Sequence, residues 1–189
     1  SYIDHFLKLG FAVFTFDYRC FGDSQGEPRN YIDANRHLQD IEAAIKHVKT
    51  LSGINTQKIG LWGSSYGGGH VLSTAAVNNS VKAVAAQVPF VSGLATVMSF
   101  SMGYQIQGFF HGINDIIRSI FSLKPHYVKV IAAPSEFALM NTPESYPGYS
   151  ALIPKNSTWE NKAPGRICLT LPMYMPTLKV SNIKCPTLV

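Results

Sequence analysis

A serine with the spacing needed for covalent catalysis lies in residues 63–67, which read GSSYG. They fit the pattern Gly-x-Ser-x-Gly of a nucleophile elbow, a very sharp strand-to-helix turn that holds a serine hydroxyl ready to attack a carbonyl. The turn brings strand and helix into contact, so Gly63 and Gly67 are expected to be the small residues that permit it. Ser65 is then the nucleophile. The backbone N–H of Tyr66, at a helix N-terminus, is expected to donate to the oxyanion.

The residues on either side make this pattern more specific. The bare pattern arises by chance in about 6% of chains of this length. Residues 58–62 read as a short buried strand before it, and residues 70–77 read as a helix of small residues after it. Strand, elbow and helix in that order are the context that the chemistry requires. The alternative is a Gly/Ser-rich loop that binds a phosphate or nothing.

Helices and strands alternate along the first half of the chain. Residues 11–16 form an apolar run rich in β-forming side chains, which predicts a strand buried on both faces of a parallel sheet. Residues 33–50 have helical apolar spacing and begin at a capping residue, Asp33. Residues 81–88 read as the next strand. This order predicts an α/β fold with a central, mostly parallel sheet flanked by helices.

Composition excludes several other classes. The net charge is +5, but the basic residues are scattered singly, which argues against a nucleic-acid partner. Cys20, Cys168 and Cys185 are odd in number and widely spaced, which fits neither a disulfide framework nor a metal site. We therefore expect no metal and no cofactor. Free thiols favour a reducing compartment such as the cytoplasm.

The alternation stops after residue 90. Residues 94–123 carry many aromatic, Ile and Met side chains, but glycines, glutamines and His111 interrupt them, so a membrane span is not expected. Helices that cover a sheet edge and line an apolar cavity fit better, although the same stripe would also suit plain core. Residues 134–176 are Pro-rich and aromatic, and they read as a folded, irregular excursion.

Four segments in this order resemble the α/β-hydrolase superfamily: FTFDYRCFGDSQG, GSSYGG, VAAQVPF and IKCPTLV. The resemblance is nearest to esterase-like hydrolases that include fungal polyketide transferases and relatives of dipeptidyl-peptidase domains. It implies a hydrolase core truncated at both ends, with residues 1–90 as partial core carrying the elbow, residues 91–180 as a helical or irregular cap, and residues 181–189 as the start of the next core strand. Cys20 stands where such loops usually have glycine.

The resemblance also implies a function for the parent protein. Ser65 would cleave a carboxylic ester, thioester or amide of a small molecule with an apolar part, through an acyl-enzyme. In this family the acid and the histidine follow later strands, beyond Val189, and a second oxyanion donor precedes Ser1, so the piece alone is expected to be inactive. An acyltransferase on the same fold and a non-catalytic binding protein are the alternatives. The sequence leaves the oligomeric state open.

The histidines within the chain are not expected to replace the missing base. His70 follows the elbow on its helix, with its side chain directed away from the tip. His37 and His47 are expected on the surface of the amphipathic helix, and His111 and His126 in the cap. Each is predicted to be a surface or hydrogen-bonded polar residue.

Overall fold

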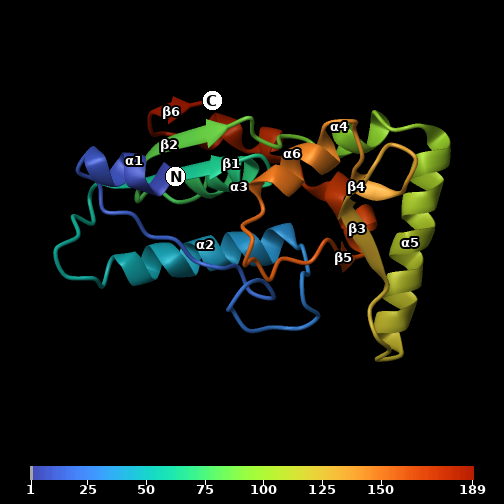
Figure 1. Cartoon of the computed structure of the whole chain (residues 1–189). Coiled ribbons are helices and arrows are strands. Elements are labelled where there is room, and N and C mark those ends of the chain that lie inside the picture. Colours follow the sequence, from blue (N-terminus) through green and yellow to red (C-terminus); the bar gives the residue numbers. More distant parts are fainter. Residues whose placement is uncertain (1) are drawn as a thin grey trace. The chain divides into compact units, whose positions relative to one another are not determined.

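The computed structural model describes residues 2–189, which fold into two compact units (Figure 1). The sheet unit comprises residues 2–18, 35–90 and 176–189, and the second unit comprises Arg19–Ala34 and Val91–Met175. This division differs from the expected ranges, because residues 19–34 group with the segment after residue 90. Residues 176–180 group with the sheet. The assignment of a core and a cap remains a prediction.

The sheet unit is built on parallel strands, as predicted. Among the described residues, β1 (Ile59–Ser64) pairs with β2 (Val81–Gln87), and β2 pairs with β6 (Thr187–Leu188), all in parallel. The helices of this unit are α1 (Tyr2–Lys8), α2 (Ala34–Val48), α3 (Tyr66–Ala75) and the short η2 (Pro176–Leu178) and η3 (Val180–Asn182). Neighbouring parallel strands need a crossover between them, and α3 is that crossover.

The core of the sheet unit forms between α2, α3 and the strands. Ile41 and Ile45 of α2 are buried one helical turn apart, as the predicted amphipathic pattern requires. Helix α3 is buried from Gly68 to Ala75, because most of its residues are small and none is charged. The strands add a further buried set: Ile59, Val81, Val84 and Ala86.

The predicted strand over residues 11–16 is wrong for this structure, which assigns no strand there. Phe11 is 60% exposed and Phe14 is 44% exposed, although a doubly covered strand would bury both. No strand of the described sheet pairs with this run. β-propensity reflects how well a side chain packs on a pleated, covered surface, but a strand also needs a neighbouring strand to pair its backbone groups. The run packs instead through ring contacts, such as Phe14 against His47.

The second unit contains more helix than strand. Its helices are α4 (Gly93–Met98), α5 (Met102–Ile120), α6 (Ser145–Leu152), α7 (Ile167–Thr170) and η1 (Leu171–Met173). Strand β3 (Tyr127–Ile131) pairs in parallel with β4 (Ala138–Met140) and antiparallel with β5 (Ala163–Pro164). The sequence did not predict these short strands. Ser92 and Ser101 cap α4 and α5 through their hydroxyl oxygens.

The apolar stripe of residues 94–123 forms α4 and α5 rather than a membrane span. Within residues 2–189, no helix is both long and apolar enough to cross a membrane. The stripe is not plain core either, because many of its side chains, including Met98, Met102 and Ile120, are exposed. The small or polar residues Gly108 and Asp115 occupy the buried side of α5 instead.

Candidate active site

Ser65 lies at the sharp junction between β1 and α3, where the sequence predicts a nucleophile elbow. Its backbone has φ 51° and ψ −120°, a combination that an L-amino acid with a Cβ rarely adopts. β1 ends at Ser64 and α3 begins at Tyr66, so a single residue makes the turn. Ser65 is exposed. Strained backbone at an exposed serine is typical of a site where geometry, rather than stability, has been selected.

Backbone hydrogen bonds hold this turn at the end of β2. The N–H of Ser65 donates to the carbonyl oxygen of Gln87 at 3.0 Å. The carbonyl oxygen of Ser65 accepts from the N–H of Phe90 at 2.8 Å and from that of Gly69 at 3.1 Å. Both backbone groups of Ser65 are therefore paired, which offsets part of the cost of its conformation.

The glycines of the elbow have different roles. A Cβ added at Gly63 would lie 2.6 Å from the carbonyl carbon of Gly67, so strand and helix touch there as the sequence predicts. A Cβ added at Gly67 would meet nothing within 4 Å. Gly63 therefore packs against the backbone of Gly67, and position 67 itself has room for a side chain. A Cβ at Gly68 would lie 2.9 Å from Cα of Pro89. The sequence pattern did not predict that position 68 also requires a small residue.

Tyr66 begins α3, so its backbone N–H points out of the N-terminal end of that helix, beside Ser65. Its ring makes edge contacts with His70, with centroids 4.5 Å apart, and with Phe90, at 5.4 Å. The positive end of the helix dipole favours a negative charge at this position. This arrangement would suit an oxyanion, as the sequence predicts for Tyr66.

Two buried histidines lie beneath the elbow. His70 is 1% exposed, and its Nε2 is 3.2 Å from Nδ1 of His37. Burial, and then the nearby His37, lower the pKa of His70 to about 3, so its ring is neutral at physiological pH. The expectation that His37 lies on the surface of its helix is wrong, because His37 is also buried. It shares one face of α2 with Ile41 and Ile45, a four-residue spacing that the sequence already contains.

A comparison with known families decides the classification. The sequence pattern described as X-Pro dipeptidyl-peptidase (S15 family) matches residues 2–126, which include all of β1, α3 and β2. The chain belongs to this S15 family. A solved α/β-hydrolase structure, GrgF from a Penicillium species, superimposes with a TM-score of 0.74 at 23% identity over 90% of this chain, so the predicted α/β-hydrolase fold is confirmed.

Individual relatives match part or all of the chain. The quorum-quenching protein AidA of Acinetobacter baumannii is 38% identical over 188 residues, which are 100% of this chain and 62% of AidA. The polyketide transferase grgF of a Penicillium species is 35% identical over 86 residues, 46% of this chain and 29% of grgF. The structure of DcsB in complex with its substrate analogue superimposes with a TM-score of 0.81 at 23% identity, covering 98% of this chain and 64% of DcsB. The chain thus spans under two thirds of the AidA and DcsB chains.

The loop at residues 19–30 of this S15 family member, in the second unit, accommodates a cysteine where glycine was expected. Cys20 is buried, with φ 70°, in the left-handed region that glycine adopts most easily. Its N–H donates to Gln25 and its carbonyl oxygen accepts from Asn30. A Cβ at Gly26 would lie 2.8 Å from the Cys20 Sγ. The departure from glycine therefore places a side chain in a backbone conformation that favours glycine.

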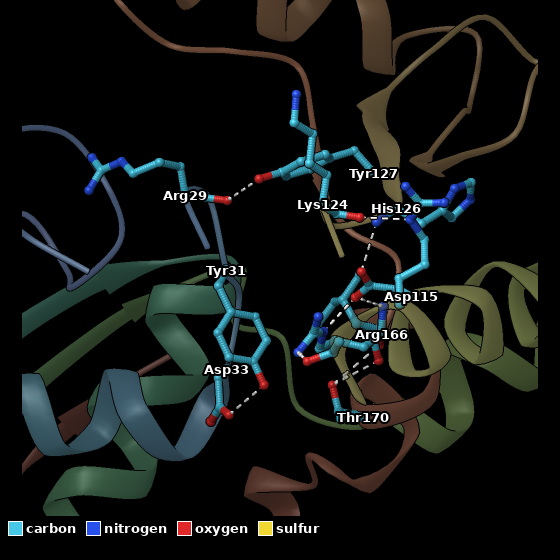
Figure 2. Close-up of polar contacts among 12 residues, drawn as sticks. Arg29, Tyr31, Asp33, Asp115, Lys124, His126, Tyr127, Arg166 and Thr170 are labelled. Carbon is cyan, nitrogen blue, oxygen red and sulfur yellow. Dashed lines mark hydrogen bonds and ion pairs between the residues drawn. The ribbon is translucent and has the colours of Figure 1, made fainter. Parts of the chain in front are cut away.

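A second polar cluster, centred on Asp115, lies within the second unit (Figure 2). The fully buried carboxylate of Asp115 accepts from the N–H of His126 at 2.9 Å, and from the N–H and Nε of Arg166 at 3.1 and 2.5 Å. The guanidinium of Arg166 also lies over the ring of Tyr31, 5.3 Å from its centroid. The cluster therefore joins α5, the start of β3 and the segment before α7 to the loop of residues 19–34. We interpret it as structural, because the Asp115 carboxylate accepts hydrogen bonds from His126 and Arg166, which belong to the same unit.

Asp115→Asn is expected to destabilise the protein by about 2 kcal/mol, since it removes the charge that the Arg166 guanidinium needs. Burial alone would raise the pKa of Asp115, but the hydrogen bonds from Arg166 and His126 outweigh it and hold the pKa below its usual value. A lowered carboxyl pKa contributes stability above the unfolded pKa of about 3.9, and this contribution is lost as the pH falls further.

The measurement is urea unfolding of the complete protein between pH 3 and 7. The wild type should lose stability below about pH 4, and Asp115→Asn should lack this part of the pH dependence. Glu160→Gln is the matched control, because Glu160 makes its ion pair with Lys162 on the exposed surface. Equal unfolding midpoints for the two variants would contradict a structural role for Asp115.

The described residues offer little to bind a metal. Within residues 2–189, no three His, Cys, Asp or Glu side chains gather as a metal site. The ring of His111 stacks on that of His126, with Nδ1 and Nε2 2.8 Å apart, but they form a pair without a third ligand of these types.

Proposed function

We propose that Ser65 is the nucleophile of a serine hydrolase that cleaves an ester, thioester or amide of a small molecule. One observation carries the proposal: the exposed Ser65 makes the strand-to-helix turn alone, in the left-handed φ region, between β1 and the N-terminus of α3. A packed structural serine has no need of such a conformation. A nucleophile does, because the turn presents its Oγ beyond the end of the sheet.

In the proposed reaction the Oγ of Ser65 attacks the carbonyl carbon and transfers its proton to a general base. The carbonyl oxygen becomes an oxyanion, to which the N–H of Tyr66 donates. Collapse of this intermediate expels the alcohol, thiol or amine with a proton and leaves an acyl-serine, which water then hydrolyses. We assign no described residue as the base. His70 is not a candidate, because it is buried under the elbow and its lowered pKa of about 3 makes its ring a poor proton acceptor.

Family membership and the relatives support an acyl substrate of this kind. The S15 family is described by a peptide-bond-cleaving activity, and grgF by the transfer of a polyketide. Both reactions proceed at a carbonyl carbon.

The test is covalent labelling of the complete protein by a fluorophosphonate, which phosphonylates an activated serine. We expect one labelled peptide, modified at Ser65, and no labelling of Ser65→Ala. Ser64→Ala is the matched control, since it removes the adjacent hydroxyl and should be labelled at the wild-type rate. Labelling of Ser65→Ala at the wild-type rate would refute the proposal. A protein that is never labelled would favour the non-catalytic binding alternative.

Acyl transfer is the second candidate, and the similarity to the polyketide transferase grgF favours it. Hydrolysis and transfer share the acyl-serine and differ only in whether water or a bound alcohol or amine releases it. Product analysis with and without an added acceptor separates the two, because a transferase forms the new ester or amide in preference to the free acid.

A further inference from the structure

Helix α5 carries its apolar side chains on the side that faces away from its own unit. Between Met102 and Phe121, all within the described residues, eight large apolar side chains are exposed, with Phe110 at 65% and Ile120 at 71%. A helix in a stable domain normally buries this side. A helical stripe of this size left open to water indicates a surface that another molecule covers.

The opposite side of α5 explains how the helix can pack this way. Gly108 and Gly112 are buried there, and a Cβ at Gly112 would lie 2.9 Å from Cδ1 of Leu169. The paired carboxylate of Asp115 completes this side. Small residues let α5 lie close against the rest of its unit, and Figure 1 shows β3 and β4 along one side of it. Its apolar stripe is therefore free for a different contact.

The spacing of the stripe matches the seam of a coiled coil. Its positions are separated alternately by four and three residues, the 3.5-residue repeat that keeps one seam facing a partner helix. The seam consists of Met102, Ile106, Phe109, Ile113, Ile116 and Ile120. Phe110 and Ile117 flank it on one side.

The seam is also symmetric in its spacing. Its six positions map onto themselves when the helix is reversed about His111, so that Met102 faces Ile120 and Ile106 faces Ile116. An isologous two-fold contact requires such self-complementarity. We propose that α5 is a dimerisation helix, which pairs antiparallel with α5 of a second copy of this chain.

Area and charge favour a second copy over a membrane surface. The eight exposed side chains present on the order of 800 Å² of apolar surface, about what one partner contributes to a standard-size interface. A membrane-surface helix usually borders its apolar face with lysine and arginine. In the sequence of α5 the charged residues are Asp115, which is buried and paired, and Arg118, whose Nε donates to the carbonyl oxygen of Lys124.

The first test measures the mass of the complete protein by sedimentation over a range of concentrations. We expect a wild-type dimer and, for Ile106→Glu, a dimer dissociation constant raised about 100-fold or more, because a carboxylate is buried in the seam. Gln107→Glu adds the same charge one residue away, on an exposed position off the seam, and should dimerise as the wild type does. Fluorophosphonate labelling tests Ser65 separately.

A second pair of variants tests the orientation. Gly103 and Ile117 flank the seam on the side of Phe110, so in the antiparallel arrangement Gly103 lies next to Ile117 of the other copy, and both positions are exposed. Gly103→Glu with Ile117→Lys then pairs opposite charges and should dimerise more tightly than Gly103→Glu with Ile117→Glu. Equal dissociation constants would overturn the antiparallel pairing. A wild type that stays monomeric, whether it binds lipid vesicles or covers α5 with another segment of its own chain, would overturn the proposal as a whole.

Discussion

Ser65→Gly is expected to abolish turnover and, at the same time, to make the protein more stable. Removing the nucleophile of a serine hydrolase lowers the rate by about 10⁴-fold or more. The backbone of Ser65, at φ 51° and ψ −120°, stores about 1–3 kcal/mol of strain that glycine relieves. Part of this gain is offset, because glycine loses more backbone entropy on folding. We expect a net stabilisation of about 1 kcal/mol.

Two further variants separate the effects on rate and on stability. Ser65→Ala also removes the hydroxyl but keeps a Cβ, so it should be as inactive as Ser65→Gly and about as stable as the wild type. Ser64→Gly lies in β1, where glycine costs about 0.5–1 kcal/mol, and it should keep its turnover. Thermal unfolding of the complete protein measures the stability of each variant, and its turnover of an ester measures the rate. A Ser65→Gly variant less stable than Ser65→Ala would contradict strain at the elbow.

The sequence predicts the elbow well because its determinants are local. A buried strand, a glycine-flanked serine and a helix of small residues are consecutive in the chain, and so are β1, Ser65 and α3 in the structure. The contact at Gly63 follows from the same short segment. What the sequence cannot supply is the hydrogen bond from Ser65 to Gln87, because that contact depends on how β2 returns beside β1.

The errors concern features that depend on distant partners. Residues 11–16 have the composition of a central strand, yet a strand exists only where a neighbour pairs with it. β4 and β5 are three and two residues long, too short to show a period of two. The apolar stripe of α5 has clear helical spacing, but spacing identifies a face and not what covers it. His37 is a different error, since its spacing from Ile41 already places it on the buried face of α2.

Gly63→Ala and Gly67→Ala are expected to differ sharply although both add one methyl group to the same motif. At Gly63 the new Cβ would meet the backbone of Gly67 at 2.6 Å, and backbone cannot move aside without opening the turn. We expect a loss of about 3 kcal/mol of stability. At Gly67 the new Cβ meets open space, and alanine suits a helix better than glycine, so stability should be unchanged or slightly higher.

The same pair of variants links the packing of the elbow to its chemistry. A shift of about 1 Å in the Oγ of Ser65 costs about 100-fold in rate, so Gly63→Ala should be labelled by a fluorophosphonate at least that much more slowly. Gly67→Ala should be labelled at nearly the wild-type rate. Labelling below the unfolding transition, with each variant's fold checked by circular dichroism, removes loss of structure as the cause. If Gly63→Ala is labelled as fast as Gly67→Ala, the contact between strand and helix does not position the nucleophile. In that case the role of Gly63 would be confined to stability.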